Sequence, residues 1–437
     1  MKLTVSGYVP EKDDDDNNTK NPVTDDSITI VPHKDPHENP SKTGQTKPEH
    51  KQAKRSNKKR IIIIISIIVV LIAAIITTVV FLLNQKPADQ PAGTSETTEI
   101  ELPHYYSSLT GEEIASPADD NKPIFCVQVP NGLDGPRPQV GLREAKVVFE
   151  AIAEAGITRF AAVFQDPQSS MIGPIRSLRP YYLDWDIPLG CSVVHAGGSY
   201  EAIHNLRTTN TPDVDESTTY MWRDYSGYRA PNNLFTSGPL LAKWAADNGF
   251  TESHPKGWAH LTPTETAAAA KTALEASERP TGDAEDSKPP IPLVENISVN
   301  YGPTASFNTH YTYNKDTNTY ARSYATGDAG TSYTCPAGLD NVKPKQQCAG
   351  PEQLTPSVIA VMFMQERRAS DNYHEDITTT GSGRAVIFQN GTATEGTWNK
   401  ASQAEQIIFK NGAGEEIKLA VGQLWISAIP NYGSINY

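Results

Sequence analysis

The pattern of hydrophobic and polar positions divides the chain into a polar start, one long apolar run and a remainder with many short apolar runs. The long run, residues 61–83, contains 23 residues and no charge. At about 1.5 Å per residue, a helix of this length reaches roughly 34 Å, which is enough to cross a bilayer with some tilt. We therefore expect a single transmembrane helix at 61–83.

The residues that flank this run predict its orientation. Lys86 is the nearest positive charge after it, whereas six basic residues lie just before it: Lys51, Lys54, Arg55, Lys58, Lys59 and Arg60. Basic flanks stay in the cytoplasm, so we expect a single-pass protein of the cell membrane with a cytoplasmic N-terminus and extracellular C-terminal domains. A cleaved signal peptide and a buried core helix are the alternatives. The run is too long and too far from Met1 for a signal peptide, and no A-x-A site follows it.

The polar segments on both sides of the run predict no folded structure. Residues 1–60 are rich in Asp, Asn, Lys, Pro and His with scarcely any apolar clustering, which is typical of a disordered arm. The charges of this cytoplasmic arm are either a solvated topology signal or a docking tail. Residues 84–103 have the composition of a flexible linker that holds the folded part away from the membrane.

Short apolar runs alternate with helix-like patterns from 104 to 262. The predicted strands are Ile124–Val129, Lys146–Ala153, Thr158–Phe164 and Cys191–His195, and the predicted helices are Tyr200–Leu206 and Gly238–Asn248. Strands interleaved with helices indicate an extracytoplasmic α/β domain over this range.

The pattern changes twice after residue 262. Thr262, Pro263 and Glu265 form a capping-box sequence before an Ala-rich run, which predicts a helix that ends in a polar linker within 263–292. Residues 293–437 contain only strand and turn signals, including hairpins at Asn390-Gly391 and Asn411-Gly412, the second between Ile407–Phe409 and Glu416–Leu419. We expect a mainly antiparallel β domain here, and an α+β fold overall.

The charge balance restricts the partners of the outer part. The whole chain has a net charge of −13 and the arm has +2, from 12 basic and 10 acidic residues, so the outer part carries −15. An acidic surface argues against nucleic acid and against general attraction to anionic lipids or wall polymers. Any site for an anion must then be a local basic cluster.

The four cysteines fall into two pairs of different character. Cys335 and Cys348 lie in a Gly/Pro/Gln-rich stretch outside the cell, where disulfides persist, and we predict a bridge between them. Two free exposed thiols are the alternative. Cys126 and Cys191 lie in apolar, strand-like runs, which is typical of small buried core residues rather than of nucleophiles.

Candidate binding residues are densest between Gly135 and Ser199. Arg176 and Arg179 lie three apart between two prolines, so a loop or a single turn would project both guanidiniums to one side. Guanidinium groups are suited to bidentate capture of phosphate or carboxylate. The candidate ligand-binding residues are Arg137, Arg143, Glu144, Arg159, Arg176, Arg179, His195, Gly197, Gly198 and Ser199.

Two features of this set leave alternatives open. The Gly197-Gly198-Ser199 backbone could approach an anion if Ser199 caps the following helix. His195 is typical of a core or pocket-edge residue rather than of a metal ligand, and we predict no metal site. The arginines could instead be consumed by internal salt bridges, because acidic residues are equally numerous: Glu144, Glu150, Glu154, Asp166 and Asp184.

Several stretches in this order resemble the YerB-like lipoprotein family of bacterial envelopes, a two-part domain family of unknown function. They are RPQVGLREAKVVFE, GITRFAAVFQ, IGPIRSLRPYY, VVHAGGSYEA and YRAPNNLFTS, followed by GSGRAVIFQNGTATEGTWNKAS and GQLWISAIP. The resemblance covers most of 120–430 and implies a membrane-anchored envelope protein. Family members are usually anchored through a lipidated cysteine, but here no cysteine lies near the membrane and the span takes over the anchoring. The loop 326–350 looks like an insertion.

The layout is also similar to that of the LytR-CpsA-Psr envelope phosphotransferases, with a short arm, one span and an outer α/β domain. Those enzymes use arginines to hold a polyprenyl diphosphate. GLREAKVVFE, ITRFAAVFQ, Arg176 with Arg179, and HAGGSYEAI fall in a comparable order. The usual Arg-Ser-Asp start is Arg143-Glu144-Ala145 here, which puts that activity in doubt.

Three classes of function follow from these observations. The first is an envelope protein that binds an anionic, phosphate-bearing ligand or cell-wall precursor through the arginines. The second is a phosphotransferase or hydrolase acting on a polyprenyl diphosphate, with a divalent cation held by Glu144 or Glu150 as its cofactor. The third is a structural scaffold for other envelope proteins. Because the sequence contains no convincing nucleophile or base, whether the protein is an enzyme stays open, no cofactor is expected for the first class, and we rank binding first.

Overall fold

The computed structural model describes residues 103–279 and 288–437. These residues belong to one compact unit, Glu99–Tyr437. The predicted arm, span and linker, apart from residue 103, lie outside the described residues, as do 280–287 of the predicted helix and linker. None of the helices in the two described ranges is long and apolar enough to cross a membrane. The transmembrane helix at 61–83 therefore stays a prediction.

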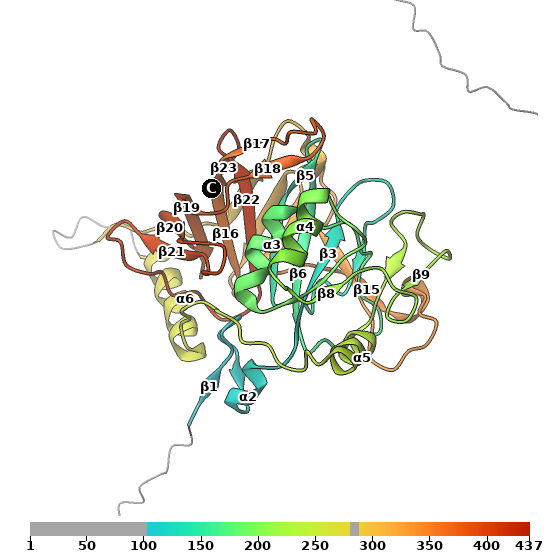
Figure 1. The fold of residues 1–437 in the computed structure, drawn as a ribbon. Helices are drawn as coiled ribbons and strands as arrows, with labels where there is room; N and C mark the ends of the chain where they lie inside the picture. Colours follow the sequence, from blue (N-terminus) through green and yellow to red (C-terminus); the bar gives the residue numbers. More distant parts are fainter. Residues whose placement is uncertain (1–102, 280–287) are drawn as a thin grey trace, which may run out of the picture. The chain divides into compact units, whose positions relative to one another are not determined.

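A ten-stranded mixed sheet forms the centre of the unit (Figure 1), in the order β21-β20-β19-β16-β22-β5-β6-β3-β7-β8. The half at the β8 edge contains β3 (Ile124–Pro130), β5 (Val147–Glu154), β6 (Ile157–Gln165), β7 (Ser192–Val194) and β8 (Asp213–Val214). The half at the β21 edge contains β16 (Val358–Met364), β19 (Gly381–Gln389), β20 (Thr392–Lys400), β21 (Ile408–Asn411) and β22 (Leu424–Pro430). The halves join where β22 pairs in parallel with β5, with Ser427 opposite Glu150. Strands of both predicted domains thus share one sheet.

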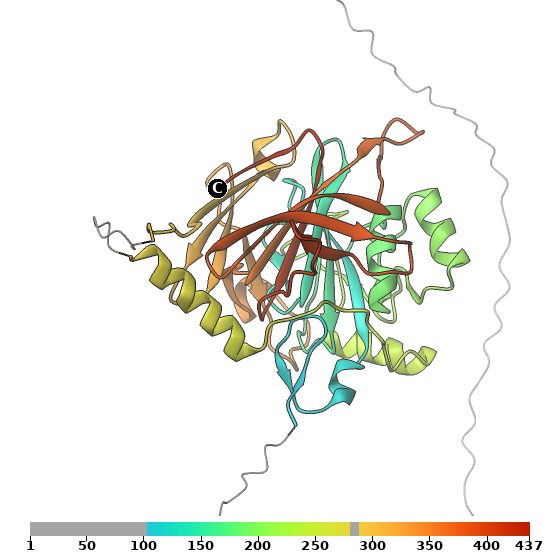
Figure 2. The same cartoon turned by 90° about the vertical axis from the view of Figure 1, so that its left-hand side faces the viewer.

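Both faces of the inner strands β3, β5, β6, β16 and β22 are buried, which explains why these strands are nearly continuous apolar runs rather than alternating ones. Along β3, Ile124 and Cys126 point into one core, whereas Phe125 and Val127 point into the other. The first core is covered by α3 (Pro180–Asp186) and α4 (Tyr200–Thr208). The second is covered by a four-stranded sheet and by α5 (Gly238–Asn248). In Figure 2 the green helices α3 and α4 lie on one side of the sheet and the light-orange strands β11, β12 and β13 lie on the other.

The remaining strands form smaller sheets around this centre. The four-stranded sheet is antiparallel, in the order β13-β12-β11-β23, and Tyr313 lies opposite Tyr320 with ring centroids 5.0 Å apart. Its strands are β11 (Asn296–Asn300), β12 (Thr309–Asn314), β13 (Thr319–Tyr324) and β23 (Ser434–Asn436). The others are β1 (Tyr105–Tyr106), β2 (Glu113–Ile114), β4 (Gln139–Val140), β9 (Trp222–Arg223), β10 (Leu234–Phe235), β14 (Thr331–Thr334), β15 (Ala349–Gln353), β17 (Glu366–Arg368) and β18 (Glu375–Ile377).

The helices begin where the sequence provides caps. Thr262 accepts a hydrogen bond from the Glu265 amide and forms the predicted capping box of α6 (Pro263–Ser277). The side chains of Ser199 and Ser237 likewise accept a hydrogen bond from a backbone amide in the first turn of α4 and α5, respectively. The short helices are α2 (Pro117–Asp120), α7 (Pro344–Gln347), η1 (Ile187–Leu189) and η2 (Ala305–Phe307).

The structure confirms the α+β class and the hairpin at Asn390-Gly391, where both residues have positive φ and β19 pairs with β20. The strand predicted at Glu416–Leu419 is wrong, because only isolated bridges form there, from Lys410 to Glu416 and from His260 to Leu419. The division into an α/β domain over 104–262 and a β domain over 293–437 stays a prediction about independent stability.

Candidate functional site

A cavity of about 810 Å³ opens beside the turn between β5 and β6. Its walls come from five places: the loop after β3, the β5–β6 turn, the loop between β6 and α3, the β9–β10 loop and the β17–β18 hairpin. The charged and polar side chains that line it are Asn131, Asp134, Glu154, Thr158, Arg159, Arg176, Arg229, Asn232 and Tyr373. Of the predicted binding residues, Arg159 and Arg176 are therefore brought together here.

Arg159 and Arg179 hold one carboxylate between them. Arg159 Nη2 donates to Oε1 of Glu154 and Arg179 Nη2 donates to Oε2, each over 2.8 Å, and both arginines are about 95% buried. Burial by itself would raise the pKa of Glu154, but the two guanidiniums outweigh it and lower that pKa. Their Nη1 groups donate to the carbonyls of Ser177 and Leu178. Both guanidiniums are therefore engaged in internal salt bridges, which is the alternative that the sequence left open.

Arg176 is held in the structure in a different way from Arg159 and Arg179. Its backbone is held by a bond from its amide to the Gln128 carbonyl (2.8 Å) and one from the Ala196 amide to its own carbonyl (3.1 Å). Its half-buried guanidinium lines the cavity, and among residues 103–279 and 288–437 no side chain or carbonyl forms a hydrogen bond or ion pair with it. Burial lowers the pKa of Arg176, with Glu154 acting in the opposite direction. Arg176 is therefore a positive charge at the cavity wall with unused donors.

The upstream candidates lie elsewhere. Arg137 donates to Asn131 and to the Ser306 carbonyl, and its guanidinium lies 3.7 Å from the ring centroid of Tyr324. Arg143 pairs at the surface with Glu352. Glu144 accepts hydrogen bonds from the backbone amides of Gln168 (2.5 Å) and Ser169 (3.1 Å). None of the three lines the cavity of Arg176.

The histidine and glycine candidates form a separate internal cluster. His195 is fully buried, with Nδ1 2.9 Å from the Gly197 carbonyl and Nε2 2.9 Å from Asp213. The Gly197 amide donates to Asp215, and the Ser199 amide donates to the Leu178 carbonyl. An added Cβ at Gly198 would lie 3.1 Å from that same carbonyl, so the glycine allows close packing. Two of these amides therefore already have acceptors within the chain.

The most deeply buried charged pair of the structure was missed as a pair from the sequence. Glu150 on β5 and Arg322 on β13 are both fully buried, with a 3.0 Å contact between Oε2 and Nη2. Glu150 also accepts from Trp425 Nε1 (2.9 Å) and Thr158 Oγ1 (3.0 Å). A lone glutamate inside the apolar run KVVFEAIA was the available signal, but its partner lies 172 positions away. Glu150, on a strand of the predicted α/β domain, thus binds Trp425 and Arg322, which belong to the predicted β domain.

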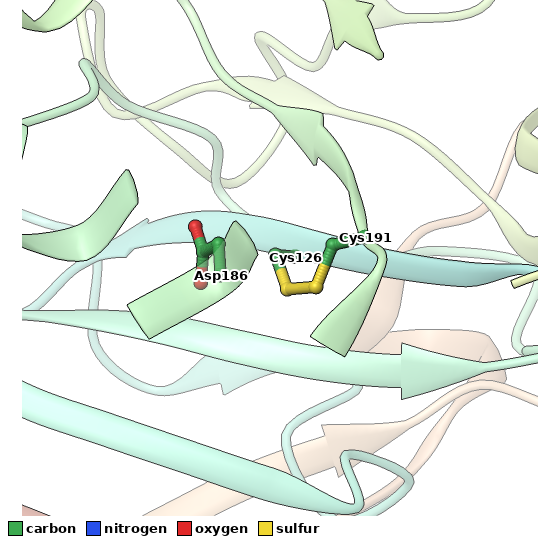
Figure 3. A group of neighbouring side chains, drawn as sticks. All are labelled: Cys126, Asp186 and Cys191. Atoms are coloured by element: carbon green, nitrogen blue, oxygen red, sulfur yellow. A yellow bond between two sulfur atoms is a disulfide. The ribbon is translucent and has the colours of Figure 1, made fainter. Parts of the chain in front are cut away.

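Both cysteine pairs form disulfides. The predicted bridge Cys335–Cys348 is confirmed. Cys126 and Cys191 are buried as predicted, but they are bonded to each other rather than free, which corrects their description as separate core residues. Figure 3 shows this bond beside Asp186, and the ligand atoms of the three residues lie within 4.8 Å of one another. Because cysteine binds a metal as the thiolate, the disulfide-bonded Cys126 and Cys191 offer no such ligand in the oxidised state.

Fold and cavity together define an α+β protein with one large sheet and a polar cavity at a strand turn. Two families described as "Protein of unknown function (DUF3048)" match the chain, the N-terminal domain over 109–251 and the C-terminal domain over 297–426. "Putative lipoprotein YerB" of Bacillus subtilis (strain 168) is 26% identical over 336 residues, which are 74% of this chain and 86% of that protein. The crystal structure of YerB from Bacillus subtilis superposes with a TM-score of 0.59 at 22% identity, over 76% of this chain and 100% of that one. This chain belongs to the YerB-like family.

Proposed function

We propose that this protein is a membrane-anchored protein of the extracytoplasmic envelope that binds an anionic, phosphate-bearing ligand in the cavity at Arg176. The envelope location is supported by the lipoprotein description of the Bacillus subtilis relative and by the apolar run 61–83 with its basic flank. The two disulfides agree with an oxidising compartment.

One observation carries the anion site. Arg176 presents a half-buried guanidinium to the cavity, and no partner is found for it among the described residues. A guanidinium with free donors in a partly dehydrated site binds phosphate more strongly than the same group in water, because neighbouring protein lowers the local dielectric. Arg229 adds a second positive side chain on the β9–β10 loop. Arg159 and Arg179 are left out of this site, since Glu154 already occupies them.

Replacing Arg176 with alanine should weaken binding of inorganic phosphate at least tenfold, because a hydrogen bond between charged groups contributes roughly 1.5–3 kcal/mol. Isothermal calorimetry or an NMR titration of the full-length protein measures this change. Arg143→Ala is the matched control, since Arg143 is an exposed arginine that pairs with Glu352 outside the cavity. Equal phosphate affinity of the wild type and Arg176→Ala would contradict the proposed site.

The topology has its own test. A membrane-impermeant maleimide applied to intact cells should modify a cysteine introduced near Gln90 but not one introduced near Lys42, because the basic flank keeps residues 1–60 inside. The four native cysteines are all engaged in disulfides and do not compete for the label. Labelling near Lys42 alone would reverse the proposed orientation.

A further inference from the structure

We propose that the ligand of this cavity is a sugar phosphate, with the phosphate on Arg176 and the sugar ring against Tyr373. This inference rests on the proposed function, since it names the chemical class of the ligand at the same site. It is carried by the size of the cavity, the balance of its polar groups and the exposed side chains on its walls.

The cavity is too large for a phosphate ion alone. Its volume of about 810 Å³ falls in the range of roughly 300–1,000 Å³ that is typical of cavities for organic ligands. A phosphate on Arg176 would leave most of this space open. The remainder of the ligand must therefore suit the other walls.

Those walls suit a hydroxylated group rather than a hydrocarbon. Half of the lining residues have polar side chains, and these include both donors and acceptors. Asp134 and Arg229 are exposed, and no side-chain partner of either is found in the part of the chain that the structure describes. Asn232 uses its amide nitrogen to bind the Asp134 carbonyl (2.9 Å). Sugar hydroxyls both donate and accept, so they can use Asp134 and Arg229 together, whereas a prenyl chain would leave these groups dehydrated and unpaired.

Two large side chains on the walls are more than half exposed. Leu133 is 60% exposed and Tyr373 is 58% exposed. Tyr373 is held in place because the next residue, His374, forms a backbone bridge with Glu154 at the end of β5. Exposed apolar surface at a polar cavity is typical of a ligand site, and an aromatic face packs well on the C–H face of a sugar ring.

The test compares ligands and variants of the full-length protein by calorimetry. The ligands are inorganic phosphate, glycerol 3-phosphate, geranyl phosphate, glucose 1-phosphate and N-acetylglucosamine 1-phosphate. We expect the better of the two sugar phosphates to bind at least tenfold more tightly than inorganic phosphate. Tyr373→Ala should weaken that sugar phosphate about fivefold to tenfold and leave inorganic phosphate unchanged. Tyr200→Ala, which removes an even more exposed tyrosine from α4 outside the cavity, should change neither affinity.

The two proposals fail in different ways. Equal affinities for phosphate and both sugar phosphates, or no effect of Tyr373→Ala, would overturn the sugar phosphate inference and leave the anion site standing. Tightest binding of geranyl phosphate would replace the sugar class with a lipid phosphate. Absence of binding of every phosphate compound, or binding that Arg176→Ala does not weaken, would overturn the proposed function itself.

Discussion

Replacing Glu150 with glutamine is expected to lower the free energy of unfolding by about 3 kcal/mol or more, because a buried arginine then loses its counter-charge. Arg322 is fully buried, and its guanidinium lies 4.6 Å from the ring centroid of Tyr324 and 4.7 Å from that of Trp425. Burial alone would lower the pKa of Arg322, but the Glu150 carboxylate together with Tyr324 and Tyr311 outweighs it and raises that pKa well above its usual value. Two further nitrogens of Arg322, Nε and Nη1, have no hydrogen-bond acceptor among the described residues. The charge therefore depends on Glu150.

Urea unfolding under non-reducing conditions, followed by tryptophan fluorescence, measures this loss. The matched control is Glu395→Gln, because Glu395 and Arg384 form an ion pair of the same kind with both side chains about half exposed. That change should cost less than about 1 kcal/mol. Replacing Arg322 with methionine in the Glu150→Gln background should restore part of the stability, since it removes the stranded charge. A Glu150→Gln variant as stable as the control would mean that water or another group compensates Arg322.

Replacing Asp186 with asparagine is expected to make the protein more stable at pH 7 but not at pH 4. Burial raises the pKa of Asp186 well above its usual value, and only the 3.2 Å bond from Gln128 acts in the opposite direction. The other oxygen of Asp186 has no partner among the described residues, which fits a protonated, neutral acid. A carboxyl with a raised folded-state pKa contributes its full stability below about pH 4, and that contribution is lost as the pH rises toward the folded-state pKa.

Asparagine does not ionise, so the Asp186→Asn variant does not lose stability in this way as the pH rises. The difference in unfolding free energy between Asp186→Asn and the wild type should therefore grow by up to about 1.4 kcal/mol per pH unit above pH 4. Denaturation at a series of pH values measures it. Asp247→Asn is the surface control: Lys243 lowers the pKa of Asp247, so this variant should gain nothing as the pH rises. A constant difference between Asp186→Asn and the wild type from pH 4 to 7 would show that Asp186 is ionised in the folded protein.

The candidate site could be predicted only in part from sequence. Arg176 and Arg179 were a natural pair, because they lie three apart between two prolines. The structure separates their roles: Arg179 is the N-cap residue of α3 and its side chain binds Glu154 in the interior, whereas Arg176 lies on the preceding loop, which lines the cavity. The remaining walls could not be foreseen, since Arg229 and Tyr373 lie on loops distant in sequence and no local pattern shows that these loops meet the loop of Arg176.

Local chemistry explains what the sequence alone determined. Capping residues, Asn-Gly turns and apolar runs act over a few neighbouring positions, so they predicted α6, the β19–β20 hairpin and the α+β class. The Cys335–Cys348 bridge was also within reach, because the two cysteines lie 13 positions apart in one loop.

Only the tertiary structure decided which distant groups meet. The pairing of β22 with β5, the ion pair of Glu150 with Arg322 and the Cys126–Cys191 bond link positions separated by 65 residues or more. Apolar burial drives such contacts without direction, and many pairings of the same strands would bury similar area. The physical reason that this arrangement prevails is the joint satisfaction of both cores and the buried polar groups, which no local pattern encodes.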